Sequence, residues 1–94
     1  MNETELLTRL LDLADEAGLQ VRTIRGGASQ EGEPGASSAT CIVRGEPWIV
    51  LATRDSADER IGVVAQALRT YAPDLLESRY LPPAVRERLG LSTD

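Results

Sequence analysis

The spacing of the apolar residues changes at Gly18, and this change of period constrains the fold more than any other feature. Before it, leucines recur every three or four positions between Leu6 and Leu13, which is the spacing of an amphipathic helix. After it, residues 19–24 largely alternate between apolar and polar side chains, which is typical of a strand with one buried face. The chain is therefore expected to build both helix and sheet.

The middle of the chain predicts a long loop followed by a β-hairpin. Residues 25–38 contain four Gly, one Pro and three Ser without any periodicity, so we expect a flexible loop inside the domain. Two short β-branched runs, 39–43 and 48–51, flank a turn at residues 44–47. The second run is apolar throughout, which indicates a central place in the sheet.

The last third of the chain carries helix signals. Ser56 and Glu59 have the spacing of a capping box at the start of a second helix, which Pro73 is expected to stop. Residues 74–77 are expected to form a short turn. Residues 83–89 predict a final helix, because a proline occupies its first position and a glycine follows its end.

These elements predict a single α+β domain over residues 1–94, with a flexible internal loop at about 25–38. The order is α-β-β-β-α-α, which favours a three-stranded, mostly antiparallel sheet with helices packed on one face. A chain of 94 residues is long enough for one hydrophobic core. The sequence contains no internal repeat and no sign of a second domain.

The charge and composition exclude several classes of partner. The net charge is −5, and all ten basic residues are Arg, so the chain lacks the basic patch that nucleic acid requires. No apolar run approaches the roughly 20 residues that span a bilayer. The acidic N-terminus differs from a signal peptide, and a lone cysteine forms no disulfide framework. We expect a cytoplasmic protein that binds neither nucleic acid nor membrane.

The sequence contains few residues suited to catalysis or to metal binding. The chain has no histidine, so the usual general base, the commonest zinc ligand and the histidine-dependent triads are missing. Cys41 lies within a predicted strand and is interpreted as a small buried core residue rather than a nucleophile. Trp48 and Tyr71 are interpreted as core aromatics. We therefore predict no catalytic residue, no metal ligand and no cofactor.

Acidic residues gather at three places, for which ordinary structural roles suffice. They are Asp15 with Glu16, Glu31 with Glu33, and Asp55 with Asp58 and Glu59. The first pair ends a solvated helix face, the second lies in the predicted loop, and the third surrounds a helix N-terminus, where the helix dipole favours negative charge.

Two small groups remain as candidate binding residues. Arg25, Gly26 and Gly27 could hold an anion with backbone N–H groups, although no Gly-Lys-Ser/Thr sequence and no helix follow them as in a phosphate-binding loop. Arg79 and Tyr80 precede a double proline and could lie on a binding surface.

Part of the chain resembles the ImmA/IrrE-type metallopeptidases, which are small gluzincins with a zincin-like fold. Residues 44–51, R-G-E-P-W-I-V-L, look like the hairpin of that family. Residues 56–61 look like the start of its motif helix, and residues 65–71, A-Q-A-L-R-T-Y, occupy the motif itself. Residues 80–83, Y-L-P-P, are similar to a later leucine-proline motif.

The residues that make those enzymes catalytic are missing. In this alignment Gln66 and Thr70 occupy the positions of the two zinc-binding histidines, and Ala67 occupies the position of the catalytic glutamate. Histidines one helical turn apart bind zinc, and the glutamate activates water. The resemblance therefore implies a degenerate zincin-like fold without zinc or protease activity.

Three functional hypotheses follow. The first is a non-catalytic interaction or self-association domain that binds a protein partner or a second copy of itself, for example as a homodimer. The alternative is a small-ligand or anion-binding domain that uses the Arg25-Gly26-Gly27 loop. The third is an enzyme with carboxylate or arginine chemistry.

Overall fold

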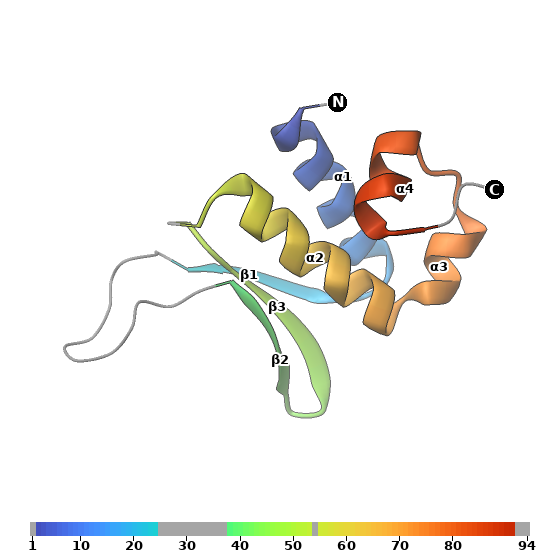
Figure 1. The fold of residues 1–94 in the computed structure, drawn as a ribbon. Coiled ribbons are helices and arrows are strands. Elements are labelled where there is room, and N and C mark those ends of the chain that lie inside the picture. The colour runs from blue at the N-terminus through green and yellow to red at the C-terminus, as the bar shows by residue number, and fades with distance from the viewer. Residues whose placement is uncertain (1, 25–37, 54, 92–94) are drawn as a thin grey trace.

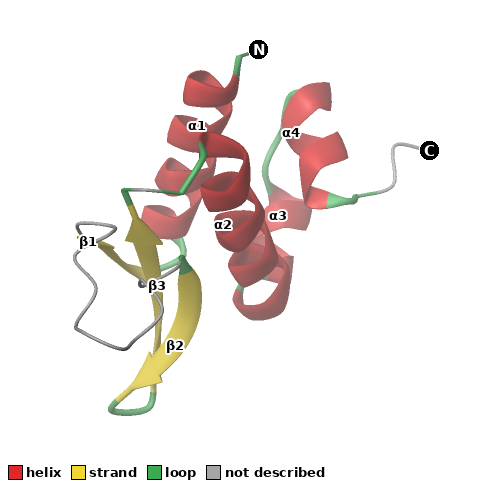
Figure 2. Cartoon of the chain, turned by 60° about the vertical axis from the view of Figure 1, so that its left-hand side comes forward, coloured by secondary structure: helices red, strands yellow, loops and turns green. Residues whose placement is uncertain are grey.

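The computed structural model describes residues 2–24, 38–53 and 55–91. In this part of the chain a three-stranded sheet forms one layer, and helices cover one of its faces (Figure 1). Figure 2 shows the sheet and the helices as two separate layers. The predicted α+β class and element order are confirmed, with one further short helix.

The N-terminal helix and the first strand form where the apolar period predicts them. Helix α1 (Glu3–Glu16) begins at a capping box, in which Asn2 Oδ1 accepts from the Glu5 N–H at 2.8 Å. The chain then turns at Gly18, whose φ of 81° lies in the left-handed region that glycine adopts readily. Strand β1 (Gln20–Ile24) follows directly.

The sheet is mixed, with one antiparallel and one parallel pair. Strands β2 (Ala39–Val43) and β3 (Glu46–Ala52) form the predicted antiparallel hairpin, and β3 also pairs in parallel with β1. The strand order is β1-β3-β2. The sequence predicted a mostly antiparallel sheet, whereas only one of the two strand pairs is antiparallel. The difference arises because β3 inserts between the two earlier strands and runs in the direction of β1.

Three helices complete the domain. They are α2 (Ala57–Tyr71), α3 (Pro73–Ser78) and α4 (Pro83–Leu89). The expected turn at residues 74–77 is instead a short helix, because Pro73 takes its first position, where a missing N–H costs nothing. Helix α4 ends at Gly90, which has a φ of 75°.

The core lies between the helices and the covered face of the sheet, and it is entirely aliphatic. No polar or charged residue is buried among the described residues. The largest fully buried side chains are Leu10, Ile49, Ile61, Val64, Leu68, Leu76, Val85 and Leu89. Among the described helices, none combines the length and the apolar character needed to cross a membrane.

Three residues expected in the core lie outside it. Cys41 is exposed, because β2 is an edge strand and Cys41 shares a register position with Trp48 on the face without helices. Trp48 is consequently only half-buried. Tyr71 is 42% exposed, because it is the last residue of α2.

Candidate functional site: a free sheet edge and its groove

Strand β2 forms an outer edge of the sheet and carries no charged side chain. Its sequence is Ala-Thr-Cys-Ile-Val, and within the described residues only β3 pairs with it. Proteins usually protect such edges with charges, prolines or bulges, because unpaired backbone groups attract another strand. An uncharged, β-branched edge is therefore a surface on which a further strand can form.

The hairpin register determines which backbone groups of β2 point outward. Antiparallel strands alternate between pairs that exchange two hydrogen bonds and pairs that exchange none. Ile42 is opposite Pro47, which has no N–H, so this pair belongs to the second kind. Thr40, two positions away, is equivalent. The N–H and C=O groups of Thr40 and Ile42 consequently point away from β3, toward the open edge.

The turn of the hairpin agrees with this assignment. Arg44 and Gly45 have φ values of 53° and 82°, as expected for a two-residue turn that matches the twist of the strands. Such a turn places Val43 and Glu46 in a hydrogen-bonded pair, and the alternation continues along β2 from there.

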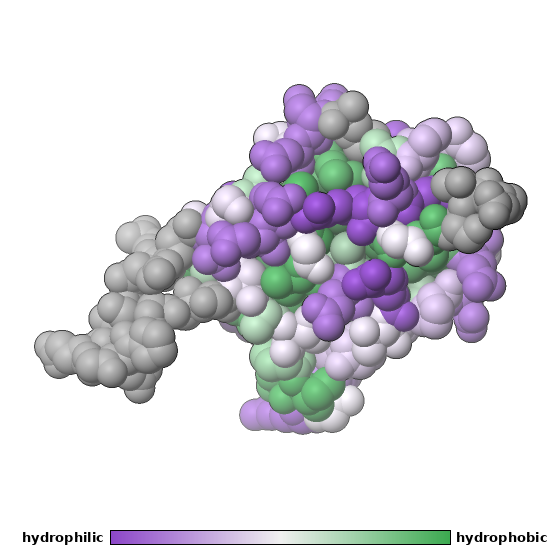
Figure 3. Space-filling view, in the orientation of Figure 1, coloured by the Kyte–Doolittle hydropathy of each residue, from purple (hydrophilic) through white to green (hydrophobic). Residues whose placement is uncertain are grey.

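A groove of about 430 Å³ runs between this edge and α2. Ser38, Ala39 and Thr40 line it from the strand side, and Val63, Gln66, Ala67, Thr70 and Tyr71 line it from the helix. Three large hydrophobic side chains are exposed in the described part of the chain, and two of them belong to these elements: Ile42 to β2 and Tyr71 to α2. Figure 3 shows hydrophobic surface over the β2–β3 hairpin, below the hydrophilic outer face of α2.

The groove contains neutral hydrogen-bonding groups. Gln66 and Thr70 are exposed on the flank of α2 that lines the groove, and Ala67 is 1% exposed. These are the three positions that the metallopeptidase resemblance aligns with the ligands and the base. An amide, a hydroxyl and a methyl group supply neither a general base nor a strong zinc ligand. Across the described residues, no three Cys, Asp or Glu side chains converge on a potential metal site.

Opposite charges lie at the two ends of β2. The basic residue Arg44 is in the hairpin turn at its C-terminal end. At the N-terminal end, the Ser38 N–H donates to Asp55 Oδ2 at 2.7 Å, and Ser38 Oγ accepts from the Ala52 N–H at 2.9 Å. Strand β2 thus has Arg44 at one end and Asp55 near the other, and Glu46 of β3 lies opposite Val43 at the turn end.

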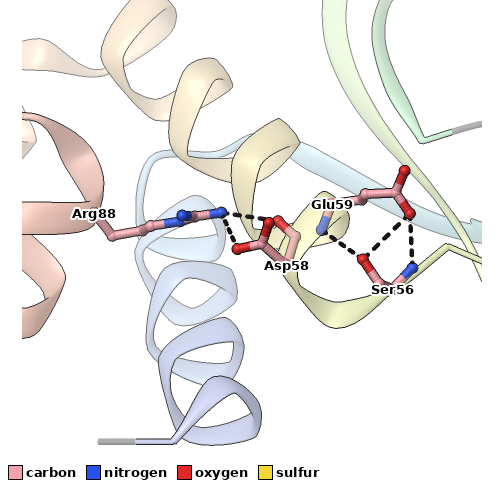
Figure 4. Close-up of polar contacts among 4 residues, drawn as sticks. All are labelled: Ser56, Asp58, Glu59 and Arg88. Atoms are coloured by element: carbon pink, nitrogen blue, oxygen red, sulfur yellow. Dashed lines mark hydrogen bonds and ion pairs between the residues drawn. The ribbon is translucent and has the colours of Figure 1, made fainter.

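The acidic residues at the start of α2 have structural roles, as predicted. The Glu59 N–H donates to Ser56 Oγ, and Glu59 Oε1 accepts from the Ser56 N–H at 3.0 Å (Figure 4). Arg88 Nη2 lies 2.6 Å from Asp58 Oδ1 and donates to the Asp58 carbonyl at 2.9 Å, which ties α4 to α2.

Of the binding residues proposed from the sequence, Arg79 and Tyr80 do not line this groove. Arg25, Gly26 and Gly27 lie outside the described residues. Arg79 forms an ion pair with Glu16 at 2.7 Å, and Tyr80 is 87% exposed. Arg79 and Tyr80 line a separate hollow between α1 and the start of α4, to which α1 contributes both acidic and basic side chains.

A second open surface lies on the face of the sheet without helices. Arg22 stacks over Trp48, with its guanidinium carbon 4.8 Å from the ring centroid, a cation–π arrangement. The Trp48 Nε1 is buried without a hydrogen-bond partner in the described structure. Cys41 lies beside Trp48 in the register and is exposed on the same face.

The open edge is a candidate functional feature that the sequence patterns did not reveal. Two signals were available, namely the absence of charge in residues 39–43 and the proline opposite Ile42 in the hairpin. Neither signal identifies an open edge unless the strand order is known. That order places β2, rather than β3, at the edge of the sheet. Comparison with known proteins gives no identification, because no family model, no curated protein and no solved structure matches the chain.

Proposed function

We propose that this chain is a non-catalytic interaction domain that binds an extended protein segment by adding it as a strand to β2. The observation that carries this proposal is the uncharged β2 edge, with the N–H and C=O groups of Thr40 and Ile42 pointing outward beside an open groove. Adding a strand to a sheet edge is a general mode of peptide recognition.

The two parts of the site contribute differently to binding. The backbone groups of Thr40 and Ile42 offer four hydrogen bonds, each worth about 0.5–1.5 kcal/mol net. Side chains of the added strand that share the helix-facing side would enter the groove against Val63, Gln66 and Tyr71. The backbone supplies affinity for any extended segment, and the groove selects among segments.

The chemistry of the groove favours binding over catalysis. Its described lining contains no carboxylate, amine or guanidinium, and Tyr71 is the one residue there of a type that serves in general acid–base catalysis. In this proposal the chain is a degenerate relative of the zincin-like fold in which Gln66 and Thr70 serve recognition. Its place is the cytoplasm, and its partner is protein, not nucleic acid or membrane.

The test compares tagged baits in the source cell extract. Ile42→Pro removes an outward N–H without removing a β2–β3 hydrogen bond, whereas the control Ile42→Val keeps both the N–H and the strand propensity. Both variants should keep the wild-type circular dichroism spectrum and melting temperature within a few degrees. We expect Ile42→Pro to lose the bound protein and Ile42→Val to retain it. Equal recovery by the two folded variants would contradict the proposal.

A further inference from the structure

We propose that the strand added to β2 is β2 of a second copy of this chain, so that two sheets join into one six-stranded sheet. This inference rests on the proposed function and names the partner. The two strands run antiparallel about a two-fold axis that passes beside Cys41. Most homodimers have such two-fold symmetry, in which the same surface patch is used by both copies.

The outward backbone groups limit the possible registers. Only residues whose N–H and C=O groups point outward can exchange hydrogen bonds across the new edge, so Thr40 and Ile42 must be used. An axis beside Cys41 pairs Thr40 of each copy with Ile42 of the other and makes four hydrogen bonds.

The neighbouring symmetric registers gain no further bonds. An axis at Thr40 would pair Thr40 with its own copy and Ile42 with Ser38, whose N–H already donates to Asp55 at 2.7 Å, so this register makes four bonds as well. An axis at Ile42 would pair Thr40 with Arg44, which has a φ of 53° and belongs to the turn. Neither alternative therefore exceeds the four bonds of the Cys41-centred register, and the charges at the two ends of β2 distinguish between them.

Charge complementarity favours the same arrangement. The register places Arg44 of each copy opposite Ser38 of the other, next to the Asp55 carboxylate that Ser38 contacts. The basic and acidic ends of β2 therefore meet twice in one dimer. A parallel pairing would instead bring Arg44 against Arg44 and Asp55 against Asp55. The strand itself is uncharged, which lets two copies with a net charge of −5 approach there.

The dimer also covers the exposed hydrophobic side chains of the edge. Ile42, which is 57% exposed, would lie beside Thr40 of the second copy, at the end of its groove near Val63. Because the two-fold axis is perpendicular to the sheet, both α2 helices remain on the same face. The two grooves then face each other across the new strand pair.

The position of Cys41 makes this register directly testable. Cys41 is in a hydrogen-bonded pair with Trp48, so across the new edge it faces Cys41 of the second copy in a non-hydrogen-bonded pair. Such pairs have Cα atoms about 4.5 Å apart, within the range that a disulfide spans. Mild oxidation with diamide, which accepts the two electrons and two protons of the thiols, should therefore link the copies through Cys41.

The experiment uses the full chain and measures crosslinking on non-reducing gels with mass-spectrometric identification of the joined peptides. In the same register Ala39 faces Val43 of the second copy. Cys41→Ser/Ala39→Cys and Cys41→Ser/Val43→Cys should therefore crosslink when mixed but at least tenfold more slowly when each is alone. Sedimentation of the unoxidised protein should show a dimer that Ile42→Pro abolishes. Arg44→Glu should weaken it roughly tenfold, since two attractive contacts become repulsive.

Two results would overturn the self-pairing. One is a chain that stays monomeric at about millimolar concentration, which is ample for weak association. The other is crosslinking of the single Ala39→Cys or Val43→Cys chain at the rate of the mixture, which indicates random collision. If the chain is monomeric but captures a different protein from the extract, and Ile42→Pro abolishes that capture, only the second copy is overturned as the partner. A monomer with no partner sensitive to Ile42→Pro would overturn the proposed function as well.

Discussion

Individual residues of the core determine whether so small a domain stays folded. Leu10 is completely buried beneath α2, and Ile42 is mostly exposed at the sheet edge. Leu10→Ala should lower the free energy of unfolding by about 2–5 kcal/mol, because it removes buried methylene groups and leaves a cavity. Ile42→Ala should change it by less than about 1 kcal/mol. Urea denaturation of the two variants, at a concentration where both are monomeric, checks the difference; equal losses would contradict the buried position of Leu10.

Replacing each of two glycines with alanine should change the stability of the domain in opposite directions. Gly90 has a φ of 75°, and an added Cβ would lie 3.0 Å from Arg69 Nη1. Gly90→Ala should therefore destabilise the domain by about 1 kcal/mol. Gly62 has ordinary helical geometry in α2, and its nearest contact would be Arg88 Nη2 at 3.9 Å. Gly62→Ala should stabilise by about 0.5–1 kcal/mol. Thermal melts of both variants measure the signs, and two losses would refute this account of α2.

At the scale of elements, the capping box of α2 holds the helix that lines the groove. Ser56→Ala removes the acceptor for the Glu59 N–H and should cost about 1 kcal/mol. Ser78 provides the matched control, because its hydroxyl donates only to the Leu75 carbonyl on an exposed surface. Ser78→Ala should change the unfolding midpoint by much less. If the two substitutions cost the same, the cap would not be a determinant of α2 stability.

The elements other than the short helix α3 could be predicted from the sequence, but the order of the strands in the sheet could not. Apolar periodicity and the Ser56–Glu59 box predicted α1 and α2 because those signals are local. The parallel pairing of β1 with β3 depends on how the chain crosses the sheet between them, and the sequence of neither strand specifies this. The open edge escaped prediction for the same reason. Cys41 appeared to be a core residue as long as the outer position of β2 was unknown.

For the whole molecule, self-association should couple stability to concentration. A ligand or subunit that binds only the folded state raises the melting temperature by mass action. We expect the wild-type melting temperature to rise measurably as the protein concentration increases a hundredfold. The folded Ile42→Pro variant should show no such rise. Scanning calorimetry across this range provides the measurement, and a constant wild-type value would argue against a dimer of this kind.

Because the core is aliphatic, tryptophan fluorescence comes from the surface of the sheet. Trp48 is the only tryptophan, and it lies on the open face beside Cys41 of the edge strand, with Arg22 stacked over its ring. Its fluorescence therefore reads the environment of the sheet surface rather than the integrity of the core. Binding at the edge should change the emission of the native protein, so that occupancy can be followed in solution without an added label.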